Sequence, residues 1–266
     1  MTDEGTILKH SQYFLKGAPP GEFDDVVRCL KLIVPGEALL ARAKSQSYPD
    51  WAIKNYTIVE VNGQRAILCK EAQVSEGVFI EPNTYTSFTY DFENRTIGES
   101  GEAVDGKTSL QEALQTVLQA DSSKLILNGT AGVYNSGGSL NIIVVSNYAD
   151  SSNLRSGSIK YLLKLTGKEL KGTFEFYAHN YEQGNTVGTN SAKFSDTVKG
   201  NSDQEIANSV KQLLHQFKEK WESSFFNGTE ILNEEGLNVL RRKLPINKTK
   251  VNWRMEVAGV AKMGTK

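Results

Sequence analysis

The residues best suited to chemistry in this chain are positively charged side chains near its carboxyl end. Residues 237–266 hold eight basic side chains and a single acid, Glu256, which gives this segment a charge of about +7. The whole chain has a charge of −1, so residues 1–236 must sum to about −8. A basic segment on an acidic body predicts binding to an acidic protein surface, a phospholipid headgroup or a nucleic acid. The alternative interpretation is a basic tail that only increases solubility.

An indole ring lies among these cations. Residues 251–263 have helical propensity, but their apolar side chains fall on two sides of the helix, so that one side would face water unless a partner covered it. Trp253 is the natural anchor of such a contact, because aromatic residues dominate binding interfaces. The alternative is that Trp253 packs on its own domain. The candidate binding residues are Arg241, Arg242, Lys248, Lys250, Trp253 and Arg254.

Patterns that would indicate catalysis or a cofactor are missing from the sequence. None of the three histidines has a partner at metal-ligand spacing, and no dinucleotide, P-loop or nucleophile-elbow motif occurs. Cys29 and Cys69 are far apart and show no CxxC spacing, which argues against a zinc site or a disulfide; Cys69 is expected to be a buried structural thiol. The sequence therefore predicts a binding protein without catalytic residues, metal or cofactor.

Targeting signals are missing as well. The first nine residues are polar and acidic, without the apolar core of a signal peptide, and no apolar run approaches the roughly 18 residues of a membrane span. A reducing, cytoplasmic setting fits best.

The elements that must present these groups begin with three short helices. Apolar residues recur at helical spacing before and after the break at 17–21, and Pro35-Gly36 ends the second helix. The third helix is not expected to extend past Tyr48-Pro49. Three helices joined by Pro/Gly turns predict an antiparallel bundle or stalk.

The middle of the chain alternates between strand and helix patterns. A hairpin is predicted from Tyr56 to Leu68 around Asn62-Gly63, a half-buried strand over 88–92, and a loop over 96–107. Thr108 and Gln111 predict a capping box at the start of the next helix. The expected apolar face of that helix consists of Leu110, Ala113, Leu114, Val117 and Leu118.

Residues 129–199 contain consecutive strand patterns separated by tight turns, which predict an antiparallel meander. Ser202 and Glu205 form a second capping box, followed by a long amphipathic helix that Gly228 is expected to stop. A short helix over 229–244 ends at Pro245. A sheet covered by one long helix is an α+β arrangement.

Three motifs then carry a resemblance to a known family. Residues 14–23 resemble "FL..APPGEF", residues 179–185 resemble "HYYEDGN", and residues 240–253 resemble "LRRxLPxTRTKxxW". These motifs, in this order, are typical of the F-actin capping protein (CapZ) alpha subunits. The segment between about Pro49 and Lys124 matches only loosely. Departures at four positions make this a divergent member: Asn180, Gln183, Asn238 and Lys248.

The resemblance implies an α+β protomer with five parts. These are an N-terminal helical stalk (1–48), a central globule (49–107), a helix with an antiparallel sheet (108–200), a long covering helix with a short helix (201–244) and a protruding amphipathic tentacle (245–266). It also implies pairing with a beta subunit that extends the sheet, although the residues do not exclude an alpha–alpha homodimer.

The function implied by the resemblance is calcium-independent capping of the barbed end of actin filaments, in the cytoplasm and cytoskeleton. Arg241, Arg242, Lys248 and Lys250 match positions that contact actin, and Trp253 lies in the tentacle. Acidic phosphoinositides and a small ankyrin-repeat protein are implied as inhibitors at the same surface. The alternative is a basic-tail module that binds anionic phospholipid or nucleic acid, with no role on actin.

Overall fold

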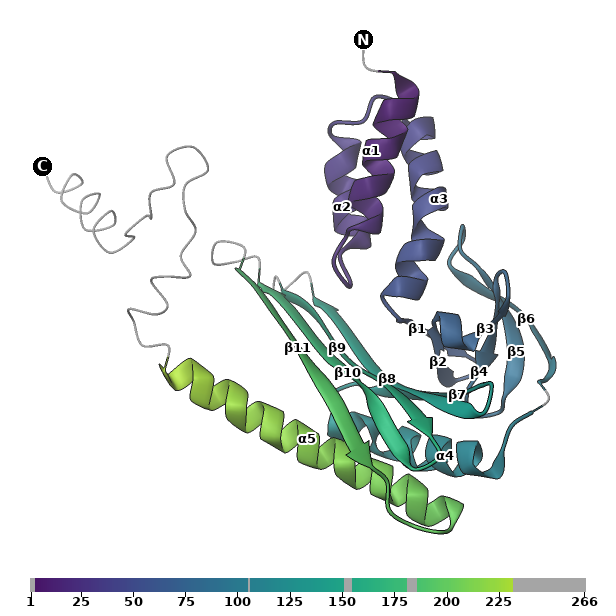
Figure 1. Ribbon diagram of the computed structural model, residues 1–266. Coiled ribbons are helices and arrows are strands. Elements are labelled where there is room, and N and C mark those ends of the chain that lie inside the picture. Colours follow the sequence, from purple (N-terminus) through teal and green to yellow (C-terminus); the bar gives the residue numbers. More distant parts are fainter. Residues whose placement is uncertain (1–2, 105, 151–154, 181–185, 232–266) are drawn as a thin grey trace, which may run out of the picture. The chain divides into compact units, whose positions relative to one another are not determined.

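The computed structural model describes residues 3–104, 106–150, 155–180 and 186–231 (Figure 1). The chain divides into two compact units, Met1–His215 and Gln216–Lys266. The first unit is α+β, as the sequence predicts, with a two-stranded, a four-stranded and a five-stranded antiparallel sheet. The predicted short helix beyond Ile231 and the tentacle at 245–266 lie outside the described residues.

Three helices form the stalk: α1 (Glu4–Lys16), α2 (Phe23–Lys31) and α3 (Glu37–Lys54) (Figure 1). The prediction that the third helix stops at Tyr48-Pro49 is wrong, because α3 continues through Pro49 to Lys54. The reason is tertiary packing. Trp51 and Ala52 are buried in the core, and Nε1 of Trp51 donates to the carbonyl oxygen of Ala18 at 2.7 Å. This burial offsets the roughly 3 kcal/mol that a proline costs inside a helix.

The predicted hairpin is confirmed. Strands β1 (Thr57–Val61) and β2 (Gln64–Leu68) pair antiparallel, and Asn62 and Gly63 both have positive φ, at 51° and 77°. This is the conformation that a two-residue hairpin turn requires. A short 3-10 helix, η1 (Lys70–Ala72), follows β2.

The next four strands form the second sheet, in the order β3-β4-β5-β6. The four strands are β3 (Gln73–Ser75), β4 (Val78–Glu81), β5 (Thr86–Asp91) and β6 (Thr96–Ala103). The predicted half-buried strand is confirmed as β5. The predicted loop over 96–107 is wrong, since it contains β6. This strand lies at a sheet edge and is mostly exposed, so it carries no apolar alternation.

Helix α4 (Ser109–Leu125) shows half of its predicted capping box. The Thr108 hydroxyl accepts from the backbone N–H of Gln111 at 3.2 Å, but the Gln111 side chain turns to the sheet instead of back to Thr108. The predicted apolar face is only partly right. Leu114 and Leu118 are buried, whereas Gln111 and Gln115 share their face and are equally buried.

The predicted meander is confirmed as a five-stranded sheet in the order β11-β10-β9-β8-β7 (Figure 1). The strands are β7 (Thr130–Ser136), β8 (Ser139–Asp150), β9 (Arg155–Thr166), β10 (Glu169–Asn180) and β11 (Thr186–Thr197). One face is apolar, since the register places Ile142 beside Leu163 and Tyr161 beside Phe174. The other face is mixed: Lys160 and Glu175 pair on it in register, and Ile143 and Val145 on the same face are buried in the core that includes the stalk residues.

Helix α5 (Asp203–Ile231) begins with the predicted capping box, in both directions. Glu205 N donates to the hydroxyl of Ser202, and Ser202 N donates to the carboxylate of Glu205, both at 3.3 Å. Ala207, Val210 and Leu214 are fully buried along one side of the helix. The expectation that Gly228 stops the helix is wrong. Glycine inside a helix costs only about 1 kcal/mol, and α5 continues to Ile231.

Candidate functional site: the two edges of the central sheet

The predicted binding residues do not enter the described geometry. Arg241, Arg242, Lys248, Lys250, Trp253 and Arg254 all follow Ile231, the last residue that the structure describes. Their role therefore stays a prediction. The described residues contain a different candidate site, the two edges of the five-stranded sheet, one of which the family resemblance implies is extended by a partner.

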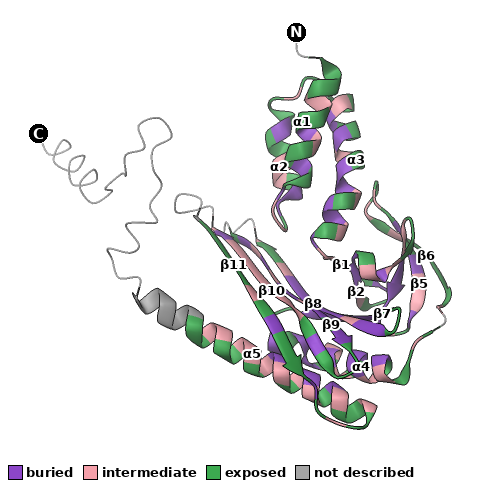
Figure 2. Cartoon of the chain, in the orientation of Figure 1, coloured by how far each residue is buried: buried purple, intermediate pink, exposed green. Residues whose placement is uncertain are grey.

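The first edge is strand β11, and it is open. β11 pairs with β10 over its whole length, from Thr186 to Thr197, in unbroken register. No strand lies on its outer side among the residues that the structure describes. Most of its side chains are exposed, and the buried exception is Phe194, on the apolar face (Figure 2).

The chemistry of β11 suits pairing with another strand. An edge strand presents a row of unpaired N–H and C=O groups, which is a template for strand addition. Isolated proteins usually protect such an edge by proline, a bulge, a very short strand or several charges. β11 has no proline and no register shift, and its only charged residues are Lys193 and Asp196. It is thus a long, unprotected edge.

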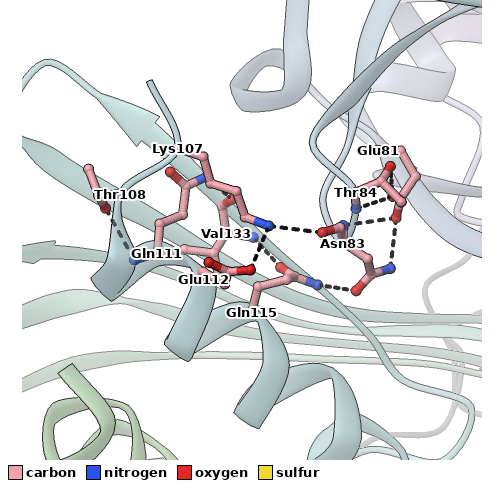
Figure 3. A network of polar contacts seen from close by, with 9 residues as sticks. All are labelled: Glu81, Asn83, Thr84, Lys107, Thr108, Gln111, Glu112, Gln115 and Val133. Atoms are coloured by element: carbon pink, nitrogen blue, oxygen red, sulfur yellow. Dashed lines mark hydrogen bonds and ion pairs between the residues drawn. The ribbon is translucent and has the colours of Figure 1, made fainter. Parts of the chain in front are cut away.

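The second edge is strand β7, and it is closed by glutamines of α4. Gln111 Nε2 donates to Val133 O at 2.9 Å, and Gln115 Oε1 accepts from Val133 N at 2.9 Å (Figure 3). Gln115 Nε2 donates to Ala131 O, and Gln119 Oε1 accepts from Ala131 N, both at 3.1 Å. The three side chains, here called the glutamine row, therefore satisfy both backbone groups of Ala131 and of Val133.

A second network holds Gln115 in place. Its Nε2 also donates to Asn83 Oδ1 at 3.0 Å, in the turn between β4 and β5 (Figure 3). That turn is fixed by the buried carboxylate of Glu81, which accepts from the backbone N–H groups and the side chains of Asn83 and Thr84. Lys107 Nζ donates to Asn83 O at 3.0 Å. The glutamine row is thus oriented by the neighbouring four-stranded sheet.

Sequence reasoning missed the glutamine row because Gln is read as a polar, solvent-facing residue. The signal that could have found it is spacing. Residues 111, 115 and 119 recur every fourth position, which places them on one helix face with Leu114 and Leu118. Residues four apart on a helix are separated by about 6 Å, close to the repeat of alternate residues along a strand.

Two ionisable groups beneath the stalk have shifted pKa values. Burial lowers the pKa of Lys160, which lies 5.1 Å from the ring centroid of Tyr56; the nearby Glu175 opposes this shift. Burial also raises the pKa of Cys69 well above that of a free thiol, which keeps it protonated and unreactive, as predicted.

The histidines, cysteines and acids among the described residues form no group that could hold a metal. None of the described helices is long and apolar enough to cross a membrane.

Comparison with known proteins adds an independent line of evidence. A family model described as F-actin capping protein alpha subunit matches residues 11–265. The F-actin-capping protein subunit alpha of Yarrowia lipolytica is 27% identical over 241 residues, covering 90% of this chain and 88% of the relative. The protein of the same name from Dictyostelium discoideum is 23% identical over 268 residues, covering 95% of both chains.

A solved structure shares the fold. The homodimeric actin capping protein alpha subunit from Plasmodium berghei superimposes with a TM-score of 0.63 at 15% sequence identity. The match covers 82% of this chain and 90% of the Plasmodium chain. The shared fold therefore extends over most of both chains.

Proposed function

The chain belongs to the F-actin capping protein alpha subunit family, and we propose on this basis that it caps the barbed ends of actin filaments as one subunit of a dimer. The observation that carries the proposal is the extent of the family match, residues 11–265. The match includes the five-stranded sheet and also the basic carboxyl-terminal segment. The activity is binding and not catalysis, and it blocks the gain and loss of actin subunits at the filament end.

The open edge of β11 supports the dimer. A second sheet that adds its own edge strand here would satisfy the outer backbone groups of Thr186–Thr197. Exposed aromatic residues on the stalk also support a partner subunit, since Tyr13 and Phe14 are 74% and 53% exposed and lie beside each other on α1. The partner is a beta subunit in a heterodimer or a second copy of this chain in a homodimer.

Assembly is tested by size-exclusion chromatography with light scattering, on the chain alone and with a beta subunit. A mass of two chains in the first sample identifies a homodimer, and a mixed dimer in the second identifies a heterodimer. Amide hydrogen exchange locates the subunit interface. The outward amides of β11 should exchange slowly only in the assembled state. A monomer in both samples would overturn the proposal.

The basic segment supplies the proposed grip on actin. Arg241, Arg242, Lys248 and Lys250 attract the filament end, and Trp253 with Arg254 docks after encounter. Reversing the charge of Arg241 and Arg242 should slow capping in a seeded elongation assay, most strongly at low salt. The matched control is Lys9→Glu with Arg42→Glu, which changes the net charge equally at exposed stalk positions. Equal capping by both variants would refute the electrostatic role.

The tail after the basic cluster is proposed to prolong binding. Deletion of residues 251–266 should leave the association rate nearly unchanged and raise the dissociation rate, because the deleted part contains the apolar anchor Trp253. Dilution of capped filaments measures the residence time. An unchanged residence time would contradict the docking role.

We further propose that capping is independent of calcium, and that phosphoinositides or a small ankyrin-repeat protein inhibit it at the basic surface. Capping rates measured with calcium or chelator, and with phosphoinositide vesicles, test both statements. The site of action would be the cytoskeleton in the cytoplasm.

The charge of about +7 on residues 237–266 also favours a second candidate function, binding of anionic phospholipid or nucleic acid without actin. Co-sedimentation with filaments, compared with a gel shift and a vesicle pull-down, separates the two. Phosphate binding that falls steeply with salt, without filament binding, would favour this second function.

A further inference from the structure

We propose that Gln111, Gln115 and Gln119 seal the β7 edge and thereby select β11 as the edge at which a second subunit pairs. This inference rests on the proposed dimer and specifies the side of the sheet that it uses. A five-stranded sheet has two edges, and either could accept a strand of a similar sheet. A dimer of one defined geometry requires that only one of them remain available.

The first step of the argument is that the glutamine row occupies the positions that a sixth strand would use. The outward groups of Ala131 and Val133 are two N–H and two C=O groups, and all four are bonded to glutamine side chains at 2.9 to 3.1 Å. A primary amide offers both a donor and an acceptor, as a peptide group does. The glutamine row thus imitates the hydrogen-bonding edge of a strand.

The second step is that the hydrogen bonds of the glutamine row are protected from water and held in place. Gln111 and Gln115 are 0% and 2% exposed, so water does not compete for their bonds. Gln115 is held by Asn83 as well as by β7, and α4 is anchored by the burial of Leu114 and Leu118. A leucine row at the same positions would bury equally well, but it would leave the β7 backbone groups unpaired at a cost of about 1–3 kcal/mol each.

The third step is the contrast with β11. That strand is longer than β7, and within the described residues no helix side chain hydrogen-bonds to its outward backbone groups. The two edges of the sheet therefore differ: the backbone of β7 is hydrogen-bonded to the glutamine row, and the edge of β11 is open. The direction of sheet growth follows from this difference.

The test uses the full chain with its dimer partner and the double variant Gln115→Leu with Gln119→Leu. The control is Gln212→Leu, which makes the same change at an exposed position of α5. We expect the amides of Ala131 and Val133 to exchange about tenfold faster or more in the double variant. We also expect species heavier than the dimer, increasing with concentration, and neither effect in the control.

Amides that stay protected in the double variant would overturn the proposal, and faster exchange with an unchanged mass would overturn the selection of the edge. A wild-type protein that is a monomer would instead contradict the proposed dimer, while the exchange rates would still report on the glutamine row. The two failures are therefore distinguishable.

Three single variants serve if the double variant does not fold. Gln119 acts on β7 only as an acceptor, whereas Gln111 acts only as a donor. Gln119→Glu should therefore keep the Ala131 amide protected, while Gln119→Leu should expose it and Gln111→Glu should lower the melting temperature. Equal exchange of the Ala131 amide in Gln119→Glu and Gln119→Leu would contradict the role of the glutamine row.

Discussion

Oε1 of Glu22 lies 2.6 Å from Nδ1 of His179, although the two residues are 157 positions apart in the chain. The same carboxylate oxygen accepts from the hydroxyl of Ser156. Glu22 follows the turn between α1 and α2, while His179 and Ser156 lie near the ends of β10 and β9. All three are at least nine-tenths buried. Glu22 and His179, which belong to two of the motifs that carry the family resemblance, thus meet at the junction of stalk and sheet.

This junction should contribute substantially to stability. Glu22→Ala removes a hydrogen-bonding partner of two buried side chains, and we expect a loss of about 2–3 kcal/mol in the free energy of unfolding. Denaturant unfolding measures it, with Glu76→Ala, an exposed acid, as the control. A double-mutant cycle with His179→Gln should give a coupling of about 1 kcal/mol or more. Additive effects would show that the contact carries little energy.

A second prediction concerns Arg95, which joins β6 to the stalk. Its Nη atoms lie 2.7 and 2.9 Å from the two carboxylate oxygens of Asp24, and its guanidinium lies 4.0 Å from the ring centroid of Tyr48. The hydrogen bond from Arg95 lowers the pKa of Asp24. Arg95→Lys keeps the charge but loses the bidentate geometry and the stacking, so we expect a loss of about 1 kcal/mol. Thermal unfolding checks this, and an unchanged melting temperature would contradict it.

A third prediction uses pH at the start of α5. Hydrogen bonds from the backbone N–H groups of Asn201 and Ser202 lower the pKa of Glu205 in the folded state. A carboxyl group with a lowered folded pKa stabilises the fold above its unfolded pKa, and this contribution is lost as pH falls through the folded pKa. Wild type should therefore lose more stability than Glu205→Gln between pH 5 and pH 3, roughly the range in which a glutamate titrates. Parallel stability curves for the two proteins would refute this.

A fourth prediction compares two glycines on neighbouring strands. A methyl group at Gly172 in β10 would overlap the carbonyl oxygen of Leu162, which is backbone and cannot move aside. At Gly188 in β11 the nearest atom would be 4.0 Å away, in the Phe176 ring. Gly172→Ala should therefore destabilise by several kcal/mol, whereas Gly188→Ala should stay within about 0.5 kcal/mol of wild type. Similar stabilities of the two variants would contradict the packing around β10.

Some elements of this fold are determined by local sequence and others by tertiary contacts. Turn chemistry placed the β1–β2 hairpin correctly because Asn62 and Gly63 themselves adopt the positive φ angles that the turn requires. The capping box of α5 was predictable for the same reason, since Ser202 and Glu205 bond each other's backbone N–H groups and are only three positions apart. The meander followed from apolar runs between tight turns.

Most of the errors lie where distant residues decide. Pro49 and Gly228 read as helix ends, but α3 and α5 continue through them, in the case of Pro49 because Trp51 is buried against the stalk. Strand β6 has no apolar alternation, since its edge position leaves it mostly exposed. The side chain of Gln111 leaves its expected cap because β7 offers it a carbonyl group.

By itself, the sequence determined the family, the α+β class, the order of most elements and the separation of charge between body and tail. These follow from short-range periodicity, turn residues and motifs, which are properties of neighbouring positions. Only the tertiary structure decided which sheet edge is sealed and which is open, and that Glu22 meets His179. Such pairings depend on which backbone and side-chain groups folding brings together across long stretches of chain, and no local pattern records them.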